Sequence, residues 1–148
     1  MSKRSRDKGC RGEREFCKIL GKLVGVDALQ RNLEQCRNGG CDTHIKGESF
    51  SDQQSHIVQQ LSQFSIEIKR YAHCDPADIS QWWKQAVYQA ERNKKRPLLA
   101  FRLDRQRWQC LVHAGRHEIN DVTGCIRMDV DLLADFLRNP DRTNVYPL

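Results

Sequence analysis

The fold can be inferred outward from one stretch, Phe64-Ser65-Ile66-Glu67-Ile68-Lys69-Arg70. Its apolar residues alternate with polar ones, which is the period of a half-buried β-strand, so Glu67 and Lys69 should project from the same face. Two charged side chains within an apolar strand cost free energy unless something compensates them. A divalent cation held by Glu67 and by an upstream carboxylate, Asp42, with a phosphate above it, would compensate both.

Length and composition fit one soluble domain spanning residues 1–148. A chain of 148 residues can bury roughly 70% of the surface that its unfolded form exposes. The 39% hydrophobic and 30% charged content is ordinary, and no apolar run reaches the length of a membrane span. The basic N-terminus lacks the apolar stretch of a secretory signal, so we expect a cytoplasmic protein whose seven cysteines are reduced thiols.

Positive charge is concentrated in three places. The formal net charge is +6, and basic residues gather within residues 3–14, 92–96 and 102–107. Such clusters suit a polyanion such as nucleic acid. A solvated surface with a basic excess is the alternative, because basic runs are common.

The N-terminal part predicts a helix. Residues 1–9 are interpreted as a basic flexible arm. Apolar residues then recur with helical spacing over residues 11–24, and Gly25 is a stop signal. Helical geometry places Glu13 on the inward side and Glu15 almost opposite. A glutamate in a first turn is also favoured by the helix dipole, so Glu13 needs no function to be explained.

The middle of the chain predicts short strands around the central one. Residues 28–33 and 41–45 can form two strands separated by the turn signal Asn38-Gly39-Gly40. Residues 46–63 read as a variable insert with one short helix, and residues 64–71 as the third strand. Asp75 and Pro76 are an N-cap and a first-turn proline, so a helix should cover residues 76–93, with Gln81, Gln85 and Gln89 in a row along one face.

The second half predicts a hairpin and a tail. Residues 98–101 and 108–112 read as its two strands. Residues 115–148 are interpreted as a peripheral C-terminal extension with a strand near residues 126–130 and a helix over residues 131–138. The fold class is therefore α/β: a helix, a three-stranded antiparallel meander, a helix and two further strands, giving a mixed central sheet flanked by helices.

The charged strand carries the candidate chemistry. Two converging carboxylates, Asp42 and Glu67, can hold a hard cation such as Mg²⁺, which prefers oxygen ligands and lowers the pKa of a bound water. Lys69 would lie on the same side and could orient that water or stabilise charge on a phosphate. The carbonyl of Ile68 is a plausible further ligand. A lone Glu-x-Lys on a strand is common by chance.

The order of three segments makes the signal more specific. Lys8-Gly9-Cys10-Arg11-Gly12-Glu13-Arg14-Glu15-Phe16, Gly39-Gly40-Cys41-Asp42 and Ile66-Glu67-Ile68-Lys69 together resemble the PD-(D/E)XK nuclease superfamily. They are most similar to its archaeal-type Holliday junction resolvase branch and to small phage-borne endonucleases. The resemblance covers residues 8–112 and implies a restriction-endonuclease-like core. Cys41 stands where many members have proline, and the insert after Asp42 is longer than in compact resolvases.

The resemblance implies a set of site residues. Glu13 would be the helix carboxylate near the metal, Asp42 the bridging ligand, Glu67 the second ligand and Lys69 the catalytic lysine. Gln85 matches the glutamine that many members place near the scissile phosphate. The site residues implied to contact DNA, through the arm, a strand end and a basic loop, are Lys8, Arg11, Arg31, Lys94, Lys95 and Arg96.

The implied function is a Mg²⁺-dependent DNA endonuclease, for which Mn²⁺ can substitute. Such enzymes attack the phosphodiester in line with metal-activated water and leave a 5′-phosphate and a 3′-hydroxyl. Selectivity for branched DNA, a role in recombination or phage DNA processing, and a homodimer follow from the resolvase resemblance. A catalytically inactive DNA-binding protein with the same fold is the first alternative.

Other interpretations stay open at this point. Cys36, Cys41 and His44, with His73 and Cys74 available later, could hold zinc in an interaction module, although the spacing is not that of a compact zinc knuckle. Trp82 and Trp83 could stack bases, but neighbours on a helix point about 100° apart, so at least one should be core. A cysteine nucleophile lacks an orienting partner.

Overall fold

The computed structural model of the chain describes residues 2–26, 29–31, 43–45, 50–115 and 117–139. A small antiparallel sheet joins β1 (Leu29–Arg31) to β2 (Thr43–Ile45). The main sheet has the strand order β3-β4-β5-β6 and consists of β3 (Phe64–Tyr71), β4 (Arg96–Leu103), β5 (Gln109–His113) and β6 (Cys125–Asp129). β3 and β4 are parallel and the other pairs antiparallel, so the main sheet is mixed as predicted.

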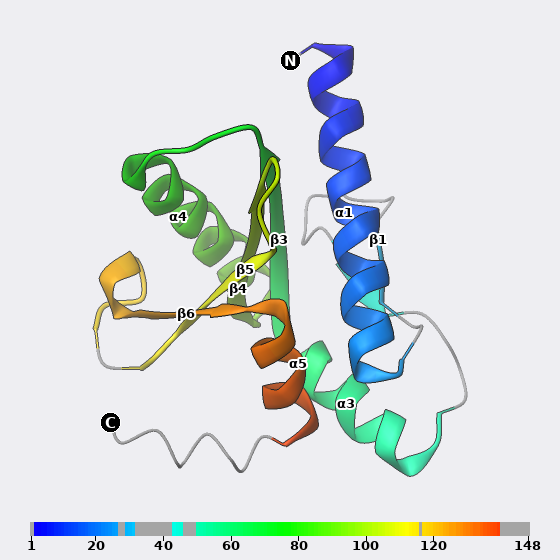
Figure 1. Cartoon of the computed structure of the whole chain (residues 1–148). Coiled ribbons are helices and arrows are strands. Elements are labelled where there is room, and N and C mark those ends of the chain that lie inside the picture. The colour runs from blue at the N-terminus through cyan, green and yellow to red at the C-terminus, as the bar shows by residue number, and fades with distance from the viewer. Residues whose placement is uncertain (1, 27–28, 32–42, 46–49, 116, 140–148) are drawn as a thin grey trace.

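Helices cover both faces of this sheet (Figure 1). The long helix α1 (Lys3–Val24), α3 (Asp52–Ser62) and α5 (Val130–Arg138) share one hydrophobic cluster on one face. The helix α4 (Pro76–Asn93) connects the parallel strands β3 and β4 along the chain. It lies on the other face of the sheet, where it packs in a second hydrophobic cluster. Alternate residues of β3 therefore face different helices.

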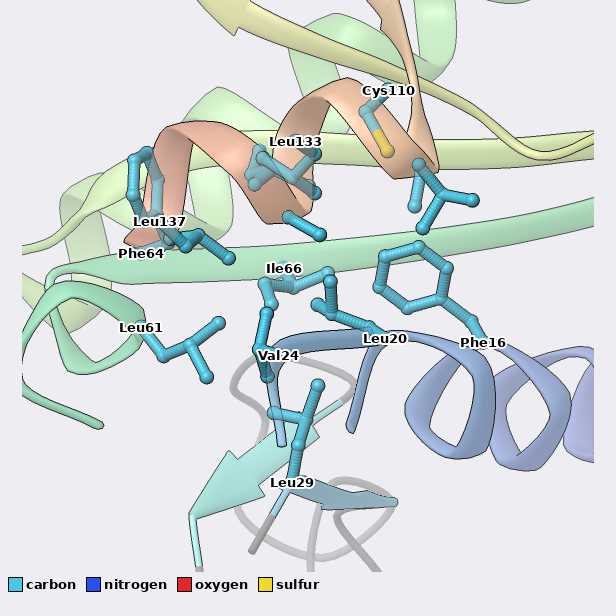
Figure 2. Packing of buried hydrophobic residues seen from close by; sticks show 14 of the residues in the cluster. Phe16, Leu20, Val24, Leu29, Leu61, Phe64, Ile66, Cys110, Leu133 and Leu137 are labelled. Atoms are coloured by element: carbon cyan, nitrogen blue, oxygen red, sulfur yellow. The ribbon is translucent and has the colours of Figure 1, made fainter. Parts of the chain in front are cut away.

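The larger cluster fixes α1 against the sheet (Figure 2). Phe16, Leu20 and Val24 of α1 recur with helical spacing and pack with Ile66 of β3, and all four are at most 5% exposed. Leu133 of α5 fills the same cluster from the end of the chain. The direction of α1 along β3 is therefore set by packed side chains.

Local signals placed several elements correctly. α4 begins after Asp75, whose side chain accepts from the Asp78 backbone N–H while Asp78 accepts from that of Asp75, with Pro76 at the first helical position. β3, the helix within the insert, the hairpin of β4 and β5, and the late strand and helix also occur as predicted. No helix in the described part of the chain is long and apolar enough to cross a membrane.

The predicted flexible arm over residues 1–9 is wrong. α1 already begins at Lys3, because Ser2 is an N-cap whose side chain accepts from the Ser5 backbone N–H. The basic residues that suggested an arm are good helix formers, and the segment contains no proline. Lys8 is also held at 3.0 Å from Asp104 at the far end of β4.

The predicted three-stranded meander differs from the observed sheets. Within the described residues β2 pairs with β1, whereas β3 pairs with β4. β2 and β3 are separated by α3, so no tight turn joins them into a hairpin. The antiparallel pairing of β1 with β2 agrees with the prediction.

The predicted peripheral extension over residues 115–148 is also wrong in its described part. β6 pairs with β5 over five residues and completes the main sheet. Leu133, Ala134 and Leu137 of α5 are 0% exposed. The helix spans only nine residues, yet it closes the core between α1 and α3 and is therefore integral to the fold.

Candidate functional site

The strand β3 presents different chemistry to its two sides. Ile66 and Ile68 lie in the cluster with α1, and Arg70 has the same orientation, because it lies beside Gly12 of α1. Glu67 and Lys69 face α4. The sequence prediction that these two charged side chains emerge together is confirmed.

The buried Glu67 and the half-buried Lys69 form an ion pair. Lys69 Nζ lies 2.8 Å from Glu67 Oε1, and the exposed fractions of the two side chains are 15% and 4%. Lys69 Nζ also donates a hydrogen bond of 2.9 Å to Gln85 Oε1 on α4. The predicted grouping of Glu67, Lys69 and Gln85 is therefore observed. The ammonium group of Lys69 therefore binds two side-chain oxygens, which fix its position.

The contacts around this ion pair form a polar seam between β3 and α4, made of Ser65, Glu67 and Lys69 facing Gln85, Gln89 and Asn93. Asn93 Nδ2 donates to Ser65 Oγ at 3.3 Å, and Lys69 pairs with Gln85 at the other end. Every second residue of a strand is about 6.6 Å further along, and every fourth residue of a helix is about 6 Å further along. The three strand residues and the three helix residues therefore have nearly equal spacing. Gln89 is therefore opposite Glu67.

Two oxygens of the polar seam are buried acceptors without a donor. Within the described residues, Glu67 Oε2 and Gln89 Oε1 have no hydrogen-bond partner. Buried polar atoms are normally paired, and an ion is one reason for an exception. A carboxylate and an amide oxygen are the ligands that hard divalent cations prefer. The polar seam therefore fits a cation of the Mg²⁺ type.

The other residues predicted for the metal site are Glu13, Ile68 and Asp42. Glu13 is half-buried on α1, in the layer on the opposite side of the sheet from α4. The side chain of Ile68 is buried in the cluster with α1, so only its carbonyl could serve the site. Asp42 lies outside the described residues. Their roles toward a metal stay predictions.

A basic groove lies on the α1 side of the sheet. It has a volume of about 860 Å³ and runs between the first half of α1 and the carboxyl ends of β3 and β4. Its lining carries two acidic side chains, Asp7 and Asp104, and seven cationic ones: Lys3, Arg4, Lys8, Arg11, Arg70, Arg102 and Arg105. Lys8 and Arg11 were predicted to contact DNA, and both line this groove.

Glu15 lies at the base of the groove instead of facing away from the sheet. Its carboxylate pairs with the guanidinium of Arg102 and lies 3.5 Å from Arg70 Nη1, and it accepts a hydrogen bond of 3.2 Å from Trp108 Nε1. The predicted outward direction of Glu15 is therefore wrong. The prediction considered only the apolar stripe of the helix, whereas the carboxyl ends of β3 and β4 offer Glu15 two arginines.

Comparison with known proteins identifies the family. The sequence model of a family described as "phage putative PDDEXK endonuclease" matches residues 4–131 of the chain. The chain belongs to this PDDEXK endonuclease family.

A solved structure is similar to this member of the family. The Holliday junction resolvase Hjc of the archaeal hyperthermophile Archaeoglobus fulgidus is 20% identical over 85% of this chain and 88% of that chain, with a TM-score of 0.41. No curated protein matches the sequence. The assignment to the PDDEXK endonuclease family rests on the match over residues 4–131.

The remaining predicted DNA contacts of this PDDEXK family member lie elsewhere. Lys94, Lys95 and Arg96 join α4 to β4 at the amino end of the parallel pair, since Arg96 is the register partner of Phe64. All three are exposed, and Lys94 has a positive φ of 53° as the C-cap of α4. The groove lies at the opposite end of these strands. The side chain of Arg31 is outside the described part.

Base stacking by the tryptophans and a cysteine nucleophile lose support, whereas the zinc site stays a prediction. Trp83 is 0% exposed and donates from Nε1 to the Ile119 carbonyl at 2.7 Å, and Trp82 is 8% exposed and stacked on Tyr71, so both belong to the core. Burial raises the pKa of the Cys74 thiol, with Asp78 adding to the shift, which disfavours a thiolate nucleophile. Cys36, Cys41 and the His44 side chain lie outside the described part, within which no three His, Cys, Asp or Glu side chains form a group that could hold a metal ion.

Sequence reasoning missed Gln89, Glu15 and part of the basic groove. Gln89 was detectable, because it continues the predicted row of Gln81 and Gln85. Arg4, Lys8 and Arg11 follow helical spacing, which would have revealed a basic face had the helix been extended to Lys3. No sequence pattern places Arg70 beside Arg102, because the register of two strands does that.

Proposed function

We propose that this member of the PDDEXK endonuclease family is a divalent-metal-dependent DNA endonuclease with its reaction centre at the polar seam. One observation carries the proposal. Glu67 is 3% exposed, with one oxygen on Lys69 and the other without a donor in the described part of the chain. An uncompensated carboxylate oxygen is costly to bury, and a bound cation would remove that cost.

Glu67 and Gln89 supply the oxygen atoms in the polar seam that suit the cation, with Asp42, Glu13 and the Ile68 carbonyl as the further predicted ligands. Mg²⁺, or Mn²⁺ in its place, would polarise a phosphoryl oxygen and lower the pKa of a bound water. Lys69 would orient that water or stabilise negative charge that develops on the phosphate. Gln85 fixes Lys69 Nζ at 2.9 Å, so the ammonium group needs little reorganisation.

The substrate assignment has two levels. A DNA phosphodiester follows from the family and from the basic groove, which suits a polyanion. Selectivity for a four-way junction, a 5′-phosphate product and a homodimer are finer expectations from the resemblance in sequence. A panel of four-way junction, flap, nicked and plain duplex DNA, with end-group analysis of the products and sedimentation of the protein, tests them.

The test of the reaction centre separates cleavage from binding. Glu67→Gln and Asp42→Asn should each reduce Mg²⁺-dependent cleavage by at least about 10²-fold. DNA affinity measured in EDTA should stay equal or rise, because each change removes a negative charge. Exposed Glu118→Gln, which makes the same change of charge in the segment between β5 and β6, is the matched control and should cleave normally.

Two outcomes would contradict the proposal. Full cleavage by Glu67→Gln would remove the polar seam from the reaction. A wild-type chain that binds DNA but cleaves no member of the panel with any divalent cation would instead support the catalytically inactive DNA-binding alternative.

A further inference from the structure

Two arginines lie side by side at the base of the basic groove. Arg70 of β3 and Arg102 of β4 are register partners on adjacent parallel strands. Like charges at neighbouring positions of a sheet repel each other. Glu15 of α1 contacts both guanidinium groups and is the acid that holds them together.

The compensation provided by Glu15 is incomplete. Glu15 contacts both guanidinium groups, and Asp104 interacts with them electrostatically but is itself paired with Lys8, so these five side chains keep a net positive charge. The side chains of Arg70 and Arg102 are 22% and 24% exposed, and both line the open groove. Part of each guanidinium side chain can therefore be reached by a ligand in the groove.

The surroundings favour an anion with several acceptor oxygens. The groove lining has five more cationic than acidic side chains. One of its acids is already engaged, since Lys8 donates to Asp104 at 3.0 Å, and this hydrogen bond lowers the pKa of Asp104. Paired guanidinium groups match the geometry of a phosphate, because each presents N–H donors in a planar fork.

Gly12 allows this arrangement. A Cβ atom at Gly12 would lie 2.9 Å from Arg70 Cβ, so only glycine lets α1 approach β3 this closely. Glu15 follows three residues later on α1, nearly one turn on. Helix, glycine and carboxylate together fix where the two guanidinium groups lie.

We propose that Arg70 and Arg102 form a binding site for a backbone phosphate of DNA and that Glu15 is the positioning residue that holds them ready. We call these three residues the arginine clamp. The inference rests on the proposed DNA endonuclease function, and it assigns the clamp a role in holding the DNA on the α1 side of the sheet, separate from the reaction centre on the α4 side.

The test asks whether removing one negative charge strengthens or weakens DNA binding. Duplex affinity is measured in EDTA by fluorescence anisotropy over a range of salt concentrations. Glu15→Gln removes a negative charge, so general electrostatics alone would tighten binding. If Glu15 positions the arginines, binding instead weakens about five- to tenfold. The slope of log affinity against log salt falls by about one, the value of one lost phosphate contact.

Asp7→Asn is the matched control. Asp7 lines the same groove on the same helix, and its substitution removes the same charge without touching either arginine. Binding should tighten about twofold. Opposite signs for two substitutions of equal charge would not arise from a change in net charge.

Arg70→Lys and Arg102→Lys keep the test decisive if Glu15→Gln fails to fold. Each preserves the charge and removes the planar fork, so each should weaken binding about fivefold. Unchanged affinity in both, or tighter binding by folded Glu15→Gln, would overturn the clamp while the wild-type protein still binds and cleaves DNA. A wild-type chain that binds no DNA would instead overturn the proposed function itself.

Discussion

The two faces of the main sheet use opposite charge arrangements within four residues of one strand. On the α4 face, Glu67 is buried in the strand, and Lys69 contacts one of its oxygens, while the other has no donor among the described residues. On the α1 face, the carboxylate comes from the helix as Glu15, and it is outnumbered by Arg70 and Arg102. In the part of the chain that the structure describes, one face therefore has a carboxylate oxygen without a donor, and the other has an excess of positive charge.

This difference indicates what each face can accept. A buried carboxylate oxygen without a donor attracts a cation, whereas two arginines sharing one carboxylate attract an anion. A metal-dependent nuclease uses both kinds of site, because it binds a metal at the reaction centre and also holds the phosphate backbone of DNA. The period of two along β3 lets one strand serve both purposes.

The largest expected effect comes from substituting neighbours that face different sides. Lys69→Met should reduce Mg²⁺-dependent cleavage by at least about 10²-fold at saturating DNA, because the polar seam loses the ammonium group of Lys69. Arg70→Met should weaken DNA binding several-fold and leave the cleavage rate at saturation within about threefold. Single-turnover cleavage and anisotropy separate the two effects.

The comparison of faces would fail in one clear case. If Lys69→Met mainly weakened binding and Arg70→Met mainly lowered the cleavage rate, the roles assigned to the two faces would be reversed. Thermal unfolding of both variants shows whether either effect comes from a damaged fold.

The sequence was sufficient where the signals are local. The alternation in β3 and the capping residues Asp75 and Pro76 act within a few residues, so both elements were predicted with their observed bounds. The start of α1 was missed, because a strongly basic segment can be an arm or a helix, and the Ser2 cap decided between them. The integral position of α5 depends on packing against α1 and α3, which no local pattern reports.

The difference between local signals and contacts between distant elements also explains which site residues could be predicted. Glu67 and Lys69 are two residues apart on one strand, so their shared direction followed from the pattern of the strand. Gln85 came from the family resemblance, and its contact with Lys69 is now observed. The orientation of Glu15 could not be obtained in this way, because the arginines that hold it belong to two strands whose register the sequence does not state.

A second prediction concerns the stability of the α1 face and compares two glycines of the same helix. Gly12→Ala should destabilise the fold by about 1–3 kcal/mol, since the new Cβ would lie 2.9 Å from Arg70 Cβ. Gly9→Ala should stabilise it by about 0.5–1 kcal/mol, because nothing lies within 4 Å of its Cβ position and alanine favours helices. Urea unfolding measures both.

The Gly12 result also tests the clamp. If α1 is displaced from β3, Glu15 moves away from Arg70, so DNA binding by Gly12→Ala should weaken under conditions where the protein remains folded. Equal stability of the two alanine variants would show that α1 does not approach β3 as closely as the clamp requires.

The smallest expected effect concerns Gln89 on the α4 face, where stability and metal binding should change in opposite directions. Gln89→Leu removes a buried amide oxygen that has no donor in the described part of the chain, so the metal-free protein should gain roughly 1 kcal/mol. The same change should weaken binding of Mn²⁺ about tenfold in calorimetric titration, because an oxygen facing the cation is lost. Gln81→Leu, an exposed position two turns earlier on α4, should alter neither quantity. A Gln89→Leu protein that is destabilised yet binds Mn²⁺ normally would mean that the amide is an ordinary packing group, and the cation site would then have to be built from Glu67 and the other carboxylates alone.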